Sequence, residues 1–71
     1  MITYDRLWHK LLDCGINKTE LCNRTGISSS TMAKMGKSEA VSLEVLEKIC
    51  KSLDCDLGDI AGFKWESEQS R

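Results

Sequence analysis

Apolar side chains recur every three or four residues along most of this chain, the period of an α-helix with one face turned inward. Two stretches show the pattern most clearly, from Tyr4 to Cys14 and from Leu43 to Leu53. The predicted inward positions are Tyr4, Leu7, Trp8, Leu11 and Leu12 in the first stretch, and Leu43, Leu46, Ile49, Cys50 and Leu53 in the second. We expect Gly15 to end the first helix and Ser42 to cap the start of the other.

A shorter helix is predicted between these two stretches, beginning at about Lys18. Asn17 can cap it by accepting a hydrogen bond from a free backbone amide, and Glu20, three residues later, completes a capping-box-like pair. Gly26 is expected to end this helix, because glycine adopts the left-handed backbone conformation at low steric cost.

A further helix is predicted immediately after Gly26. Ser28 can cap it, and Met32 and Met35 lie three residues apart and therefore on one inward face. The outward positions are Ser29, Ser30, Ala33, Lys34 and Lys37. Two short helices around a glycine corner, the second with small polar and cationic side chains, predict a helix-turn-helix motif over residues 18–37.

The last part of the chain is predicted to complete the core. Asp56 can cap a short helix over residues 57–61, in which Leu57 and Ile60 close the core. Phe63 and Trp65 alternate with charged residues, as in a half-buried strand. We therefore expect an all-α, compact five-helix fold, with a short extended C-terminal segment possible. Residues 1–66 form one domain in this interpretation, residues 1–3 are frayed and residues 67–71 are disordered.

The motif resembles that of the Cro and phage-repressor-like (XRE-type) family of helix-turn-helix regulators. With Gly26 as the corner, Cys22 falls where the two helices touch and a small residue is needed, and Ile27 falls on an inward position. The likeness extends from Tyr4 to Ile60 and matches a small single-domain subgroup of that family. The resemblance implies a lambda-repressor-like domain that binds double-stranded DNA and regulates transcription.

The net charge of −1 by itself argues against a nucleic-acid partner, because phosphate binding needs cations. The distribution of the charges along the chain changes this interpretation. Residues 18–37 hold four basic residues and one acidic residue, a net charge of +3. The remaining residues hold six basic and ten acidic residues, a net charge of −4. The positive charge is therefore concentrated on the motif. The chain has neither a long apolar run nor a secretory signal, so we expect a cytoplasmic protein with no membrane partner.

The four cysteines, Cys14, Cys22, Cys50 and Cys55, could suggest a metal or a disulfide framework. They form no C-x-x-C pair and the chain has a single histidine, so we predict no metal site and no cofactor. Cys22 and Cys50 are expected to act as small apolar residues in the interior. Metal binding and redox sensing remain the alternatives.

The predicted recognition helix, Ser28 to Met35, would enter the major groove of DNA, which is wide enough for a helix. Its serines would reach base edges, and Lys34 would contact guanine or phosphate. The start of the first motif helix would hold phosphate, aided by the positive end of the helix dipole. In the resembling family an outward glutamine commonly begins that helix, whereas this chain has Lys18. The residues expected to contact DNA are Lys18, Thr19, Ser28, Ser29, Ser30, Thr31, Ala33, Lys34 and Lys37.

These observations predict a sequence-specific transcription regulator that acts as a homodimer on a palindromic site, because a single small module covers little DNA. The candidates for the dimer contact are Leu57, Phe63 and Trp65. The alternative is a protein-interaction module, antitoxin-like or polymerase-contacting, with the same fold and little DNA binding. No enzyme motif and no small-molecule ligand site are evident, because the sequence shows neither a nucleophile–base pair nor a phosphate-cradling glycine loop.

Overall fold

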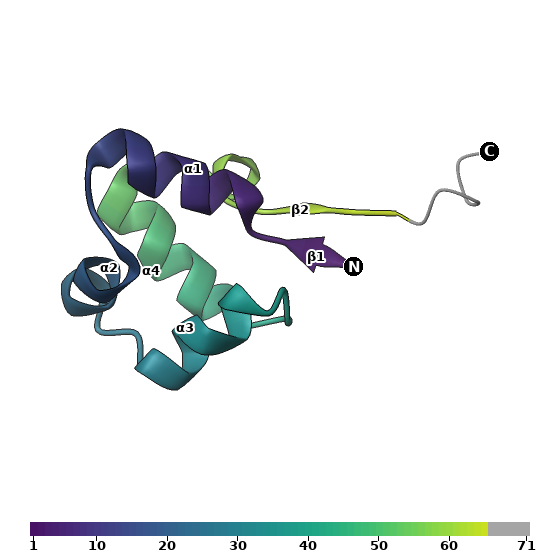
Figure 1. Ribbon diagram of the computed structural model, residues 1–71, viewed down its shortest axis with the longest axis horizontal. Coiled ribbons are helices and arrows are strands. Elements are labelled where there is room, and N and C mark those ends of the chain that lie inside the picture. Colours follow the sequence, from purple (N-terminus) through teal and green to yellow (C-terminus); the bar gives the residue numbers. More distant parts are fainter. Residues whose placement is uncertain (66–71) are drawn as a thin grey trace.

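The structure, a computed structural model, describes residues 1–65 and contains four α-helices in that range (Figure 1). These are α1 (Asp5–Cys14), α2 (Lys18–Thr25), α3 (Ser29–Gly36) and α4 (Leu43–Leu53). Helix α2 packs against both α3 and α4. Figure 1 shows α4 below α1, with α2 at the lower left and α3 at the bottom of the view. The predicted end of the domain at residue 66 and the predicted disorder of residues 67–71 lie outside the described residues.

Three of the helices begin at the caps that the sequence predicted. The side chain of Asn17 accepts from the Glu20 amide at 2.8 Å, Ser28 accepts from the Thr31 amide at 3.2 Å, and Ser42 accepts from the Val45 amide at 3.3 Å. Each cap satisfies one of the amides that a helix start leaves without an intrahelical partner. The carboxylate of Glu20 departs from the expected capping box, because it pairs with Arg24 at 2.8 Å.

Both predicted glycine stops have the left-handed backbone conformation. The φ angle is 71° at Gly15 and 77° at Gly26. The Gly26 amide donates to the Cys22 carbonyl at 2.8 Å, which closes the last turn of α2 before the chain turns into α3. Gly26 is thus the corner between α2 and α3.

The core draws on all four helices and fixes the position of α3. Its fully or nearly buried side chains are Tyr4, Leu7, Leu11, Leu21, Ile27, Met32, Met35, Leu46, Ile49 and Ile60. Met32 and Met35 hold the inner face of α3, as predicted. The Tyr4 hydroxyl donates to the Glu39 carbonyl at 2.7 Å, tying the start of α1 to the loop after α3.

The C-terminal part differs from the predicted five-helix fold. The expected fifth helix is a single 3-10 turn, η1 (Leu57–Asp59), where Asp56 and Asp59 form a capping box. Residues 2 and 3, expected to be frayed, instead pair with the C-terminal segment in a two-stranded antiparallel sheet. The predicted extended segment is confirmed at Phe63, but Phe63 and Trp65 are exposed and not half-buried. Strand β1 (Ile2–Thr3) pairs with β2 (Gly62–Phe63), with Ile2 opposite Phe63. This pairing joins segments 61 positions apart in sequence, so local patterns could not reveal it.

Several predicted core positions are exposed because the apolar stripes are narrower than their sequence suggests. Leu12 is 77% exposed and Leu43 is 72% exposed, and Leu57, expected to close the core, is 43% exposed. Trp8, Cys22 and Cys50 are half-buried against the core. No helix within residues 1–65 combines the length and apolar character needed to cross a membrane.

Candidate nucleic-acid interface

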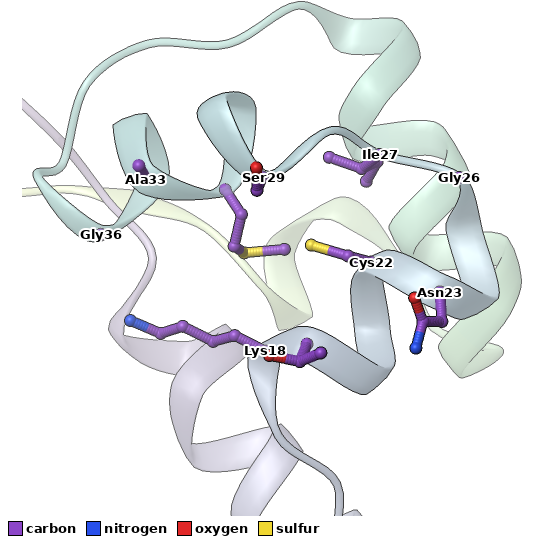
Figure 2. Close-up of a pocket in the computed structure, with 10 residues that line it drawn as sticks. Lys18, Cys22, Asn23, Gly26, Ile27, Ser29, Ala33 and Gly36 are labelled. Carbon is purple, nitrogen blue, oxygen red and sulfur yellow. The ribbon is translucent and has the colours of Figure 1, made fainter.

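Helices α2 and α3 together form an open cleft of about 790 Å³ on the outside of the molecule (Figure 2). We call it the motif cleft. Its floor includes the side chains of Cys22, Ile27 and Met32, and its walls carry Lys18, Thr19 and Asn23 from α2 and Ser29, Ala33 and Gly36 from α3. Figure 2 shows Ala33 and Ser29 on the α3 side and Lys18 and Asn23 on the α2 side. A Gly26 corner with left-handed backbone holds the two walls in this arrangement.

The outer face of α3 brings together most of the residues predicted to read DNA. Ser29, Ser30, Ala33 and Lys34 are exposed, whereas Met32 and Met35 on the opposite face are buried. Lys37, also exposed, follows directly after the helix. Neither lysine is in an ion pair within the residues described. The surface of α3 therefore presents short hydroxyl groups with two cations at its C-terminal end.

The hydroxyl groups at the start of α3 form a small network of their own. Ser28 Oγ accepts from the Thr31 amide, donates to Thr31 Oγ1 at 3.0 Å and lies 3.1 Å from Ser30 Oγ. A hydroxyl has one proton and two acceptor sites, so Ser30 donates in the last contact and the capacity of Ser28 is filled. Ser28 would have to give up part of its cap to bind a base. Thr31 is half-buried, which leaves Ser29 and Ser30 more accessible.

Lys18 crosses from the start of α2 toward two other helices. Its Nζ lies 4.3 Å from the centroid of the Trp8 ring in α1, a cation–π distance. The same atom lies 3.6 Å from the position that a β-carbon on Gly36 would occupy, at the last turn of α3 (Figure 2). The C-terminal end of a helix carries partial negative charge, which favours a cation there. Lys18 thus connects α1, α2 and the end of α3, at the edge of the motif cleft.

Arg24 contributes less positive charge to this surface than its sequence position suggests. Its guanidinium pairs with Glu20 one helical turn earlier, and about half of each side chain remains exposed. An exposed pair of this kind adds only a few tenths of a kcal/mol to helix stability.

Asn23 lines the motif cleft and was not among the residues predicted to contact DNA. Its signal was available in the sequence, because it follows Thr19 by four residues and therefore lies on the same helical face. The contact of Trp8 with Lys18 was also missed, since it joins separate helices. Sequence periodicity gives the face of one helix, but it does not show which faces of two helices meet.

The cysteines lie outside this interface except for Cys22. Cys14 is exposed, and the other three are half-buried. Within residues 1–65 the four cysteines are free thiols and no cluster of three potential metal ligands occurs. Burial, followed by the nearby Cys55 thiol, raises the pKa of Cys50 to about 11. Cys50 is therefore overwhelmingly a neutral thiol at neutral pH, and a thiolate is the reactive form of cysteine.

The fold and this surface define a helix-turn-helix domain: a capped helix, a left-handed glycine corner and a second helix with a buried apolar face and an exposed polar one. Residues 6–66 match the family model described as the Cro/C1-type HTH DNA-binding domain. The chain belongs to this family of DNA-binding domains, as its resemblance to the Cro and phage-repressor-like regulators indicated.

Two relatives agree with this assignment. The chain is 40% identical over 52 residues to the uncharacterized HTH-type transcriptional regulator YozG of Bacillus subtilis (strain 168), a match that covers 70% of this chain and 62% of that protein. This chain therefore spans less than two thirds of that relative. A crystal structure of the transcriptional regulator VanUg (Form II) superposes with a TM-score of 0.88 at 48% identity, covering 92% of this chain and 87% of that one.

Proposed function

We propose that this protein is a sequence-specific DNA-binding transcription regulator that inserts α3 into the major groove. The observation that carries this proposal is the two-sided character of α3. Met32 and Met35 hold its inner face in the core, while Ser29, Ser30, Ala33 and Lys34 are exposed on the outer face. A helix fixed from behind can present its outer side chains to base edges without first becoming ordered.

Base recognition is assigned mainly to Ser29, Ser30 and Lys34. Serine hydroxyls both donate and accept, so they discriminate weakly between bases, whereas a lysine near guanine O6 and N7 discriminates more strongly. The small side chain of Ala33 allows the DNA to approach closely, and the methyl group of Thr31 could contact the methyl group of a thymine. Asn23, on the opposite wall of the motif cleft, adds an amide of the kind that pairs with adenine or holds a phosphate.

Phosphate binding is assigned to the two ends of the motif. Lys18 and Thr19 lie at the start of α2, where backbone amides and the helix dipole favour an anion. Lys37 lies after α3 and would hold the backbone on the other side of the groove. Ser28 serves this surface by capping α3 and thereby fixing the direction of its first turn.

The regulator is proposed to act as a homodimer on a palindromic site. A single module of this size buries about 600–1,000 Å² on DNA, which limits its specificity. Two copies related by a two-fold axis would place their recognition helices about 34 Å apart, one helical turn of DNA. Leu57, Phe63 and Trp65, three exposed apolar side chains outside the motif, are the proposed dimer contact.

The test is selection of bound duplexes from a random pool at two salt concentrations, with light scattering to give the oligomeric state. We expect a selected site with two-fold symmetry and an affinity whose logarithm falls linearly with the logarithm of salt concentration. Recovery of random sequence at both salt concentrations would overturn the proposal of sequence-specific binding.

A second candidate, a protein-interaction module, is favoured by the apolar floor of the motif cleft, formed by Cys22, Ile27 and Met32, and by the net charge of −1. The floor could receive an apolar side chain of a partner protein. This function predicts no salt-dependent binding to any duplex, so the same selection separates the two candidates.

A further inference from the structure

Two cysteines are joined by a backbone hydrogen bond where α4 ends. The chain leaves the helix through Asp54, whose φ angle of 54° is in the left-handed region. The Cys55 amide then donates to the Cys50 carbonyl at 3.0 Å, five positions earlier in the sequence. This is the closing bond of a Schellman motif, in which the side chains of the two bonded residues commonly contact each other. Here both of these residues are cysteines.

We propose that Cys50 and Cys55 form a redox-closable pair, a site at which small-molecule disulfides of the glutathione type produce an intramolecular Cys50–Cys55 disulfide. The bond joins the last turns of α4 to the segment that enters η1. Neither cysteine lines the motif cleft, so the inference stands apart from the proposed DNA binding.

The backbone brings the two residues within the span of a disulfide. The Cα atom of Cys50 lies about 2.4 Å from its own carbonyl oxygen, and the Cα atom of Cys55 lies about 1.5 Å from its own nitrogen. Because that oxygen and that nitrogen are 3.0 Å apart, the two Cα atoms are separated by less than about 7 Å. Disulfides usually join cysteines whose Cα atoms are about 4.4–6.8 Å apart, so the bond needs no large movement of the backbone.

The two side chains also share one environment. Both are half-buried against the hydrophobic core, which limits the directions in which either thiol can point. Cys50 lines an open cleft of about 300 Å³ together with Leu46 and Leu57. A small reagent can therefore reach the pair from solvent although both side chains are packed on one side.

The surroundings of Cys50 disfavour its thiolate. Burial and the neighbouring Cys55 thiol raise the pKa of Cys50 to about 11, and the carboxylates of Asp56 and Asp59 act in the same direction. A dithiol whose reduced form is stabilised makes its disulfide strongly oxidising. Cys50 has the opposite surroundings, so the disulfide should resist reduction once it has formed. The neutral thiol also makes Cys50 a slow attacking group, which assigns the first attack to Cys55.

The bond forms by two successive thiol–disulfide exchanges. The Cys55 sulfur loses its proton and attacks one sulfur of the small-molecule disulfide, forming a mixed disulfide and releasing one small thiol. The Cys50 sulfur then loses its proton and attacks the Cys55 sulfur, which breaks the mixed disulfide and releases the second small thiol. Two cysteine thiols are oxidised, the reagent is reduced to two thiols, and the two cysteine protons end on these thiols.

Closure of the pair acts on the elements behind the motif. Helix α4 packs against α2, and η1 packs against α4. A covalent link between α4 and the entry of η1 therefore restrains the elements that hold α2 in place, whereas the exposed face of α3 is unchanged. The expected effect is on the stability of the fold and not on the choice of bases.

The test is equilibration of the full 71-residue chain in glutathione buffers of graded composition, in native conditions and in concentrated urea. Free thiols are blocked with N-ethylmaleimide after an acid quench. Trypsin cleaves after lysine, so the disulfide appears in the mass spectrum as residues 49–51 linked to residues 52–64. We expect the effective concentration of the pair to be about tenfold or more higher in the native chain than in urea, because folding holds the two residues within reach. Cys14→Ala, which removes an exposed cysteine outside the pair, should leave this ratio unchanged.

A second measurement closes the thermodynamic cycle. If folding favours the disulfide, oxidation must lower the equilibrium constant of urea unfolding by the same factor, which is measured on the oxidised and reduced chains. A native effective concentration above the urea value, with this matching change, supports the inference. A native value equal to or below the urea value overturns it, as does a dominant native disulfide that contains Cys14 or Cys22. The duplex selection tests the proposed DNA binding independently of these results.

Discussion

Lys18 shows how one residue can depart from a family pattern and still suit the same place. Where the resembling family commonly has glutamine, this chain has an ammonium that lies over the Trp8 ring and next to the last turn of α3. Both surroundings favour a cation, one through the ring quadrupole and the other through the helix dipole. A glutamine side chain could not use the ring in this way. The Trp8 ring therefore provides a favourable contact for a cation at position 18.

The Trp8–Lys18 contact predicts a measurable coupling energy. In a double-mutant cycle with Trp8→Leu and Lys18→Met, urea unfolding should give a coupling energy of about 0.5–1 kcal/mol, the size expected for an exposed cation–π contact. Methionine is chosen because it keeps most of the alkyl stem of lysine and removes the charge. The coupling should persist in 1 M NaCl better than that of an exposed ion pair, such as Glu20–Arg24. Additive effects of the two substitutions would show that the contact contributes nothing to stability.

Cys50 predicts a folding-dependent thiol reactivity. Its pKa of about 11 in the folded protein, against an ordinary value of 9.0, leaves about 1% thiolate at pH 9, where an ordinary thiol would be about half ionised. Alkylation by iodoacetamide at pH 9, followed by mass spectrometry, should therefore be much slower at Cys50 in the native protein than in urea. The exposed Cys14 reports reagent access in the same sample. Equal rates at Cys50 in both states would contradict the raised pKa.

The same pKa shift sets the direction of a pH effect on stability. The folded state favours the neutral thiol, so the contribution is complete below pH 9 and is lost as the pH rises toward about 11. Burial also raises the pKa of Tyr4, which acts in the same direction at still higher pH. Cys50→Ala should flatten the decline in the free energy of unfolding between pH 9 and pH 11. An unchanged decline in this variant would assign the alkaline effect to other groups.

At the scale of elements, the sequence predicted where three of the helices begin, but it did not predict which segments pair with one another. Asn17, Ser28 and Ser42 each bond to an amide three residues later, and so few residues are involved that sequence spacing suffices to locate the cap. The β1–β2 pairing brings together Ile2 and Phe63, and no local pattern contains that information. The residues expected to form the outer face of α3 follow from helical periodicity alone, once Met32 and Met35 are placed inward.

The prediction of burial was wrong for apolar residues that have no neighbouring element to pack against. Leu12 follows Leu11 by about 100° around α1, and only Leu11 reaches the core. Leu43 occupies the first position of α4 and lines an open apolar cleft together with Leu57 and Phe63. A periodic pattern of apolar residues in a sequence predicts an apolar helix face, but it does not show whether that face is buried in the core or exposed on the surface. That distinction required the positions of the neighbouring elements.

The Gly26 corner predicts a backbone penalty without a steric one. A β-carbon at Gly26 would meet no atom within 4 Å, so Gly26→Ala should lower the free energy of unfolding by about 1–2 kcal/mol through its positive φ angle alone. Gly58→Ala is the matched control, because Gly58 also has open space around it but lacks a positive φ angle. Urea unfolding of both variants measures the difference. Equal stability of the two variants would show that the corner tolerates a side chain.

At the scale of the whole molecule, the charge is divided between two regions. Residues 18–37 carry a net charge of +3, and the rest of the chain carries −4. We expect the acidic remainder to repel a DNA duplex from other faces, and so to orient the motif toward the duplex while limiting non-specific affinity. Affinity should then depend on a few lysines of the motif, and substitutions of these lysines should have distinct signatures.

Lys34 and Lys37 should differ in what their removal changes. Lys34→Ala should weaken binding to the selected site by about 1–3 kcal/mol and relax the preference at one base position, because Lys34 lies on the outer face of α3. Lys37→Ala should weaken binding to all sequences alike and reduce by about one the slope of log affinity against log salt concentration, because a phosphate contact carries no base information.

The control is Lys51→Ala, which removes an exposed lysine in the last turn of α4 and should change neither the base preference nor the salt slope. Competition titrations with the selected site and single-base variants, at several salt concentrations, measure both. A uniform loss across all sequences for Lys34→Ala would move this residue from base recognition to the phosphate contacts, leaving specificity to Ser29, Ser30 and Asn23.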